Sequence, residues 1–427
     1  MQIIHNPSTT DWTALCQRPT ATFEAILPNI RSIFDTVQQQ GDTALHTYTY
    51  QFDQVKVTDL AVSFQQIKAA EALLSEDLKK AIRQAYQNIK SFHEAQRTET
   101  VTVETQAGVR CWQQKYPIEK VGLYIPGGTA PLFSTVLMLA IPAQVAGCQE
   151  IVLCSPPQKN GSIAPEILYT ASLCGVKKIF SVGGAQAIAA MSLGTETIPQ
   201  VDKIFGPGNQ YVTAAKQYAS QGRVAIDMPA GPSEVLVAID ASADPSFVAA
   251  DLLSQAEHGV DSQVVLVTTD KAGIPTIERT LNDQLASLKR KAMAASALKN
   301  STIISFDSHQ TAIAFINQYA PEHYIINVSD TALYVAGVRH AGSVFIGPYT
   351  PESAGDYASG TNHTLPTNGF ARQYSGVNLD SFQKAITFQE ISPEGIQNLG
   401  PIVEEMAAAE GLDAHKNAIS IRLKSLS

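Results

Sequence analysis

Apolar residues recur at helical spacing in the first third of the chain. One stripe begins at Phe23 and ends at Val37, and a second begins at Leu78, just after Ser75, which is a suitable helix cap. The most apolar stretch, residues 132–146, is interrupted by polar residues and proline, and it is shorter than the roughly 20 residues that cross a bilayer. It therefore predicts a buried helix, and we expect no membrane partner.

From residue 120 onward the pattern changes to short apolar runs. The starts of the first four runs are 30, 28 and 24 residues apart, and each run is followed by glycine or proline, as in β-α-β units. The runs cover residues 121–125, 151–154, 179–182 and 203–205, and then 235–239, 264–268, 302–305, 324–328 and 343–346.

This rhythm predicts an α/β fold with two Rossmann-like parallel-sheet domains. Loops at the carboxyl ends of parallel strands are where such folds bind ligands. The last part of the chain lacks the rhythm and predicts a helical tail. No G-x-G-x-x-G and no G-x-x-x-x-G-K-[ST] motif occurs, so the glycine-rich loops alone are equally compatible with tight turns.

Composition narrows the class of protein. Of 427 residues 44% are apolar and only 16% are charged, which suggests a large core and some surface buried in an oligomer. A net charge of −9 without a basic run argues against nucleic acid as a partner. The five cysteines include no C-x-x-C pair, and the start of the chain does not resemble a signal peptide, so we expect a cytoplasmic protein with reduced thiols.

Four of the nine histidines lie in polar segments rich in small residues: His258, His323, His363 and His415. No pair has H-x-x-x-H spacing, so a metal site would combine distant segments. Gln255 and His258 share one face of a predicted helix that stops at Gly259. They could bind zinc, although an amide is an uncommon ligand and a lone histidine is more often structural.

Two more segments carry candidate chemistry. Glu322 and His323 precede an apolar strand, where neighbouring side chains point in different directions, so we do not expect them to pair. They could serve two separate proton transfers, or they could form a solvated start of the strand. In the polar segment 351–363, Asp356 is a candidate oxygen ligand and His363 a candidate substrate contact.

These segments closely resemble the histidinol dehydrogenase family, from about Ile30 to Arg422. The most specific stretches are VGLYIPGG (121–128), KIFGPGN (203–209), DMPAGPSE (227–234), SQAEHG (254–259), residues 352–363 and AHKNA (414–418). The resemblance implies oxidation of L-histidinol to L-histidine in two NAD-linked steps, through an aldehyde that stays bound to a zinc enzyme.

The resemblance also implies roles for individual residues. His323 would accept the hydroxyl proton, and Glu322 would activate the water that attacks the aldehyde. The implied zinc ligands are Gln255, His258, Asp356 and His415. The implied substrate contacts are Ser233, Gln255, His258, His323, Asp356, Glu410 and His415. The implied NAD contacts are Tyr124, Gln186 and Asn209.

The family resemblance further implies an architecture like that of aldehyde dehydrogenases. Residues 1–20 would form an arm, and residues 21–115 and 235–375 a main domain for substrate and zinc. Residues 116–234 would bind NAD, and residues 376–427 would form a dimerisation tail. The enzyme would be a homodimer in which the tail of one subunit completes the site of the other.

Two other functions are weighed against this one. A cysteine-dependent aldehyde dehydrogenase would use Cys111 or Cys148, yet neither has a neighbouring histidine or lysine that would activate the thiol. A non-enzymatic protein that binds zinc or an amino acid would have no use for Glu322 and His323.

Overall fold

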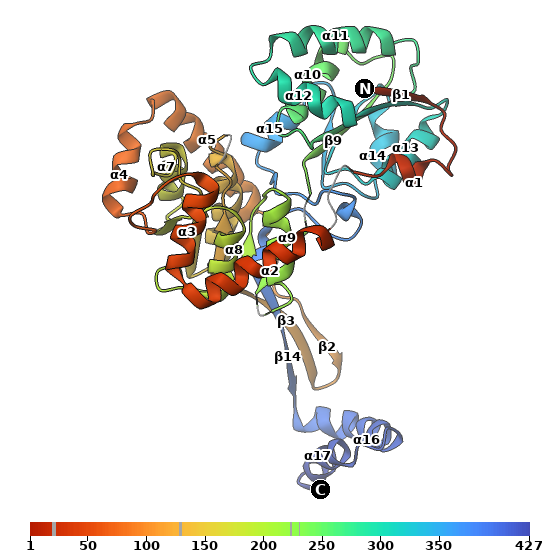
Figure 1. Cartoon of the computed structure of the whole chain (residues 1–427). Coiled ribbons are helices and arrows are strands. Elements are labelled where there is room, and N and C mark those ends of the chain that lie inside the picture. Colours follow the sequence, from red (N-terminus) through yellow and green to blue (C-terminus); the bar gives the residue numbers. More distant parts are fainter. Residues whose placement is uncertain (19–22, 128–129, 223, 230) are drawn as a thin grey trace. The chain divides into compact units, whose positions relative to one another are not determined.

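The structure, a computed structural model, describes residues 1–18, 23–127, 130–222, 224–229 and 231–427. Gly128 and Ala230 of the motifs above, and the expected boundary near residue 20, lie outside these residues. The chain forms two compact units (Figure 1). The large unit comprises Met1–Ala95 and Ile118–Phe382, and the tail unit comprises Gln96–Pro117 and Gln383–Ser427.

A five-stranded parallel sheet, in the order β6-β5-β4-β7-β8, forms one part of the large unit. Its strands are β4 (Lys120–Tyr124), β5 (Glu150–Ser155), β6 (Lys178–Ser181), β7 (Lys203–Phe205) and β8 (Ala225–Ile226). The connecting helices are α6 (Phe133–Ala146), α7 (Pro165–Leu173), α8 (Gly184–Leu193) and α9 (Gln210–Ala219). The four predicted strands are confirmed. Helix α6 is buried almost all round because it is apolar on every face.

The N-terminal helices pack against the helices that connect the strands of this sheet. They are α2 (Phe23–Gln40), α3 (Asp42–Asp53), α4 (Phe64–Ala72) and α5 (Glu76–Glu94). Ile30 of α2 is buried in one cluster with Ile188, and Ile89 of α5 is buried in another with Val121. Both predicted stripes are therefore helices, and Ser75 caps α5 by accepting a hydrogen bond from the backbone of Leu78 at 3.2 Å.

The expected grouping of residues 21–115 with residues 235–375 does not match this packing. The apolar faces of α2 and α5 share their cores with β4 and α8, whereas residues 96–117 belong to the tail unit. An amphipathic pattern shows that a helix has a buried face, but it does not show which sheet that face covers.

A six-stranded parallel sheet, in the order β1-β11-β10-β9-β12-β13, forms the other part of the large unit. Its strands are β1 (Gln2–His5), β9 (Glu234–Ile239), β10 (Gln263–Thr268), β11 (Thr302–Ser305), β12 (His323–Asn327) and β13 (Ser343–Ile346). Its helices are α1 (Trp12–Leu15), α10 (Pro245–Ala256), α11 (Ile274–Ser287), α12 (Lys291–Ala297), α13 (His309–Tyr319), α14 (Thr331–Gly337) and α15 (Glu352–Tyr357). The five predicted strands are confirmed. Strand β1 was not predicted, and it makes the start of the expected arm an edge of this sheet.

The tail unit combines an antiparallel sheet, in the order β14-β3-β2, with two helices. Its elements are β2 (Thr102–Gln106), β3 (Val109–Pro117), β14 (Gln383–Ile391), α16 (Pro393–Ala409) and α17 (Asp413–Lys424). The helical tail is confirmed for α16 and α17. Strand β14 was not predicted, because most of its residues are exposed and it lacks a buried face.

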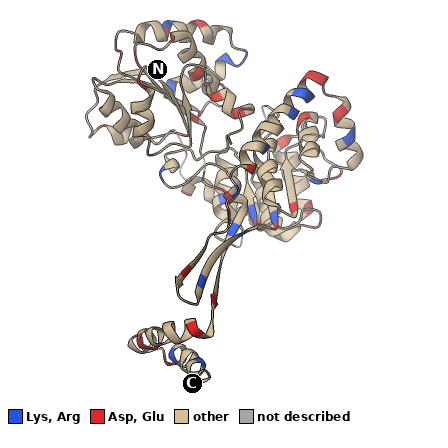
Figure 2. Ribbon diagram, turned by 180° about the vertical axis from the view of Figure 1, so that it is seen from behind, with Lys and Arg blue, Asp and Glu red and all other residues tan. Residues whose placement is uncertain are grey.

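The helices and the charged residues can be followed along the chain. None of the helices in the described part of the chain is long and apolar enough to span a bilayer. Basic and acidic residues are interspersed along the ribbon (Figure 2), with no continuous basic stripe among the residues that the structure describes.

Candidate active site

Glu322 and His323 lie at the start of β12, in the interior of the six-stranded sheet. They are 5% and 3% exposed, which excludes the solvated start of a strand that we considered. His323 Nδ1 lies 3.1 Å from the backbone oxygen of Glu234. Because a carbonyl oxygen only accepts, Nδ1 carries the hydrogen, and Nε2 is the nitrogen that can exchange a proton with a substrate.

The prediction that Glu322 and His323 do not pair is wrong. His323 Nδ1 is 3.5 Å from Glu322 Oε2. Strand β12 begins at His323, so Glu322 precedes the strand and the alternation of side chains across a strand does not apply to it. Glu322 Oε2 also accepts a hydrogen bond from the backbone nitrogen of Glu234 at 2.8 Å.

Charges around this pair shift both pKa values. Burial raises the pKa of Glu322, and nearby His323 only partly opposes the shift. Burial alone would lower the pKa of His323, but the carboxylates of Glu352 and Glu322 outweigh it and raise that pKa well above its usual value. The two side chains therefore compete for a proton in a site from which water is largely excluded.

A group of possible metal ligands lies beside this pair. Glu352 and Asp356 lie one turn apart on α15, and His258 joins them, with one ligand atom of each within 4.8 Å of the others. Asp356 Oδ1 is 3.4 Å from His323 Nε2. Burial favours protonation of Asp356, but His323, His363 and His258 outweigh it and lower its pKa. The arrangement provides an imidazole and carboxylates, which are suitable donors for zinc.

Two buried polar side chains among or near these possible ligands have no hydrogen-bond partner. Glu352 is 0% exposed, and neither of its carboxylate oxygens has a hydrogen-bond partner. Both amide atoms of Gln255, which is also 0% exposed, lack partners. Gln255 lies in the last turn of α10, which packs against α15. Buried polar groups without partners are unfavourable, so these groups fit a cation and a polar ligand between them.

His258 lies outside the helix on which it was predicted. Helix α10 ends at Ala256, so Gln255 and His258 do not share a helix face, and Gly259 does not end the helix. The residue is exposed, but the protein around its ring lowers its pKa by desolvation, with Asp356 opposing the shift. Two predicted ligands, His258 and Asp356, thus lie together.

Sequence reasoning missed Glu352 and Asp251. Glu352 is four residues before Asp356, and this helical spacing was the signal that could have identified it. Asp251 lies one turn before Gln255 on α10, where burial raises its pKa to about 7. Its charge also contributes to the raised pKa of Glu352, whose main cause is burial.

The other predicted substrate residues have different surroundings. Ser233 is half-buried directly before β9. His363 Nδ1 lies 2.8 Å from the backbone oxygen of Asp356, and Nε2 lies 3.2 Å from Thr135 Oγ1 on α6. Both ring nitrogens of His363 are therefore engaged within the protein. Glu410 and His415 belong to the tail unit, where both are exposed.

The three residues predicted to contact NAD lie at the carboxyl ends of strands in the five-stranded sheet. Tyr124 ends β4, and its hydroxyl accepts a hydrogen bond from the backbone of Gly184 at 3.1 Å; burial raises its pKa to about 12. Asn209 caps α9, its side-chain oxygen accepting from two backbone nitrogens. Gln186 is 1% exposed, and its amide oxygen has no partner, so it remains able to bind a ligand.

A buried ion pair holds the loop after β7. Lys216 Nζ donates to the backbone oxygen of Gly206 at 2.8 Å and pairs with Asp227, whose Oδ2 accepts from the backbone nitrogen of Gly206 at 2.9 Å. Gly206 has φ +133°, and a Cβ there would lie 2.2 Å from the backbone oxygen of Tyr124. This loop therefore requires glycine, and the ion pair fixes both of its backbone polar groups.

We expect Lys216→Met to lower the free energy of unfolding by about 3–5 kcal/mol, because it removes the ion-pair partner of the buried Asp227 carboxylate. Lys178→Met is the matched control, since its pair with Glu150 is exposed and contributes less than about 1 kcal/mol. Urea denaturation of both variants measures the difference. Equal losses would show that the Lys216 pair does not hold the loop.

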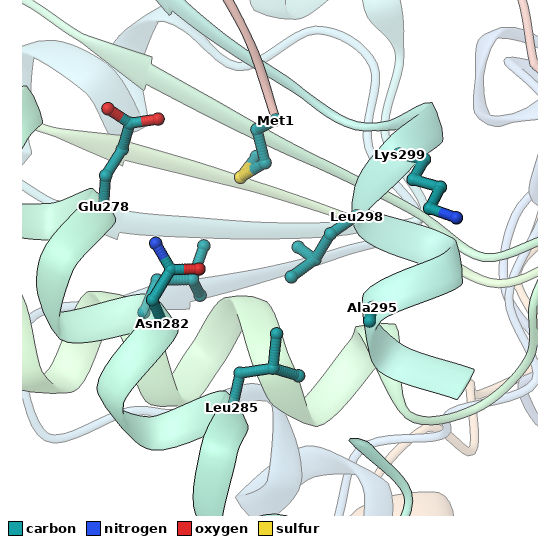
Figure 3. Close-up of a pocket in the computed structure, with 8 residues that line it drawn as sticks. Met1, Glu278, Asn282, Leu285, Ala295, Leu298 and Lys299 are labelled. Carbon is teal, nitrogen blue, oxygen red and sulfur yellow. The ribbon is translucent and has the colours of Figure 1, made fainter. Parts of the chain in front are cut away.

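A separate surface pocket of 270 Å³ lies among Met1, α11, α12 and the two residues that follow α12. Met1, Leu285 and Leu298 project toward its centre, and Glu278 and Lys299 lie at its sides (Figure 3). Its lining includes none of the predicted site residues.

Comparison with known proteins identifies the family. Residues 16–423 match the model of the histidinol dehydrogenase family. The chain belongs to the histidinol dehydrogenase family. A histidinol dehydrogenase from Bacteroides thetaiotaomicron is 57% identical over 426 residues, which cover 100% of both chains. One from Escherichia coli O6:H1 is 53% identical over 415 residues, covering 96% of this chain and 95% of the relative.

A solved structure agrees with this assignment. The crystal structure of histidinol dehydrogenase from Elizabethkingia anophelis is 56% identical, with a TM-score of 0.97, covering 100% of this chain and 98% of that chain. The resemblance inferred from the sequence motifs is thereby confirmed, as is the α/β fold. As a member of this family, the chain is an oxidoreductase.

Proposed function

We propose that the protein oxidises L-histidinol to L-histidine through a bound aldehyde, using two NAD and one zinc ion per site, at the end of histidine biosynthesis. The observation that carries this proposal is the pair of buried residues without side-chain partners, Gln255 and Glu352, near buried His323, in a chain of this family. The five cysteines are free, which fits a reducing compartment, and we propose that the enzyme acts in the cytoplasm. We also propose that it is a homodimer.

The residues present suit a zinc ion. We propose Gln255, His258 and Asp356 as ligands from the large unit and His415 as the fourth, from the tail of the partner subunit. When bound, zinc would polarise the substrate alcohol and balance the carboxylates around His323. Glu352 lies within the same group and adds negative charge that favours a divalent cation.

His323 serves as the base for both oxidations in this proposal. Its Nδ1 hydrogen is fixed by the backbone oxygen of Glu234, which leaves Nε2 to accept the hydroxyl proton. NAD would accept the hydride in each step, held by Tyr124, Gln186 and Asn209. The burial of His323 excludes bulk water from the reacting groups, which protects a reactive amino aldehyde.

Glu322 serves the second oxidation alone. Burial raises the pKa of its carboxyl, which makes the carboxylate a stronger base toward the water that attacks the aldehyde. Ser233 and His323 would contact the substrate from the large unit together with the three ligands above, and Glu410 and His415 would contact it from the tail. The hydrate that forms when the activated water attacks the aldehyde loses its proton to His323 in the last step.

The cysteine alternative finds no support in the structure. Burial raises the pKa of Cys148 to about 12, so the thiol is not activated at neutral pH. Cys111 lies on β3 in the tail unit. A protein that only binds zinc or an amino acid would make no NADH, and the experiment below separates it from an enzyme.

We expect the protein to form two NADH per L-histidinol consumed, and a chelator to abolish this activity until zinc is added back. NADH absorbance, histidine yield and zinc content, measured on the same samples, test the proposal. Calcium added at the same concentration is the control, because it prefers oxygen ligands. Full activity in protein shown to be free of metal would contradict the zinc site, and binding of histidinol without NADH would contradict the enzyme.

A further inference from the structure

Arg18 and Glu234 form a buried ion pair next to Glu322 and His323, and no step of the proposed mechanism uses this pair. Arg18 Nε and Nη2 donate to the two carboxylate oxygens of Glu234 at 2.7 and 2.9 Å. Glu234, the first residue of β9, is 0% exposed. A two-point contact of this kind fixes the orientation of the carboxylate as well as its charge.

Arg18 is itself held on several sides. Its guanidinium donates to the backbone oxygens of Cys16 and Tyr319 at 2.6 and 2.7 Å, and it lies 3.6 Å from the centre of the Tyr319 ring. The preceding helix α1 is anchored by Trp12, whose ring meets that of Phe315 edge-on at 5.5 Å. These contacts hold the positive charge of Arg18 in a fixed position inside the large unit.

Glu234 in turn contacts both catalytic residues. Its backbone nitrogen donates to Glu322 Oε2 at 2.8 Å, and its backbone oxygen accepts from His323 Nδ1 at 3.1 Å. Its carboxylate accepts from the backbone nitrogen of Glu322 at 3.3 Å. One residue therefore bonds the side chain of His323, the side chain of Glu322 and the backbone nitrogen of Glu322.

We infer that Arg18 and Glu234 form a positioning pair for Glu322 and His323. Arg18 fixes the Glu234 carboxylate, and this carboxylate and the start of β9 fix the two proton acceptors. A buried ion pair is poor grounds for inferring stability, since apolar residues often replace one without loss. Glu234 bonds the two residues once through the carboxylate that Arg18 holds and twice through its backbone, an arrangement better explained by alignment, to which reaction rates are very sensitive. The inference rests on the proposed function.

The test is a double variant, Arg18→Met with Glu234→Gln, which removes the charges together and leaves no buried ion unpaired. We expect kcat for both oxidation steps to fall by about 10- to 100-fold, the effect of misplacing a base by about 1 Å. KM for histidinol should change little, because neither side chain is among the proposed substrate contacts. Ile304→Val is the control for stability, as Ile304 shares the buried cluster of Trp12 and lies outside the site.

The variant Arg18→Lys distinguishes the effect of the two-point contact with Glu234 from the effect of the positive charge. Lysine keeps the positive charge but cannot make the two-point contact, so its kcat should lie between those of the wild type and the double variant. If the double variant does not fold, the kcat of the lysine variant is compared with that of the wild type alone, and it should be lower. A wild-type kcat in a folded double variant, or in Arg18→Lys when only that variant folds, would overturn the inference.

A second readout does not depend on histidinol oxidation. The ¹⁵N spectrum of the His323 ring in the wild type should show Nδ1 protonated, and the double variant (or Arg18→Lys in its place) should lose this fixed pattern. If the wild type forms no NADH from histidinol, the proposed function fails and this spectrum alone tests the positioning. An unchanged ring spectrum in that case would overturn the inference.

Discussion

Replacing His323 with asparagine is expected to slow the oxidation of both histidinol and histidinaldehyde by about 10²- to 10⁴-fold, the usual effect of losing a general base. The side chain is 3% exposed, and its Nδ1 hydrogen is fixed by a carbonyl, so Nε2 is its one available proton acceptor. Glu322→Gln should slow the oxidation of the aldehyde much more than that of the alcohol, because only the aldehyde step needs an activated water.

The two half-reactions can be assayed separately, starting from histidinol or from histidinaldehyde. Glu278→Gln, which removes a carboxylate on α11 outside the site, is the control and should leave both rates unchanged. Equal losses in the two steps for Glu322→Gln would refute the division of roles. Retained oxidation of histidinol by His323→Asn would show that another group accepts the first proton.

The strands that were predicted and those that were missed differ in burial. Strands β9 and β10 are buried along their whole length and appear in the sequence as continuous apolar runs. Strands β1 and β14 lie at the edges of their sheets and are mostly exposed, so neither an apolar run nor an alternation marks them. Their pairing depends on partners far along the chain, which a local pattern cannot reveal.

The sequence also could not show which end of the six-stranded sheet carries the candidate site. Parallel sheets usually bind ligands at the carboxyl ends of their strands. Asp240 lies there, directly after β9, and its carboxylate accepts hydrogen bonds from Ser242 and Ser329. Partial burial would raise the pKa of Asp240, but these bonds outweigh it and lower the pKa to about 2. At the amino ends, Glu322 and His323 adjoin unpaired buried groups. Polar residues occur at both ends, and only the structure shows which of them lack partners.

Resemblance suggested the residues of the candidate site, but it could not supply their geometry. The pairing of Glu322 with His323 depends on where β12 begins, and a shift of one residue would separate their side chains. Glu352 became a candidate only when its two unpaired oxygens were found beside His258. Arg18 precedes Glu234 by more than two hundred residues, and its role follows from contacts alone.

The exposed tail leads to a prediction about shared sites. Glu410 and His415 are exposed, as are the apolar side chains of Ile402, Met406 and Ile421 on the same two helices. Exposed apolar residues on a tail are expected when a second subunit covers them. In the proposed homodimer, His415 would therefore complete the zinc site of the partner, in which Gln255, His258 and Asp356 lie.

Mixing His258→Asn with His415→Asn, each inactive alone, is expected to restore about a quarter of wild-type activity. After random re-association half of the dimers are mixed, and in each of these one site carries both lesions while the other carries none. Mixing His258→Asn with Asp356→Asn is the control, because both lesions lie in the large unit and every site keeps at least one. NADH formation and the fraction of mixed dimers, measured with differently tagged chains, test the prediction. No recovery in proven mixed dimers of the first pair would mean that the tail serves its own subunit.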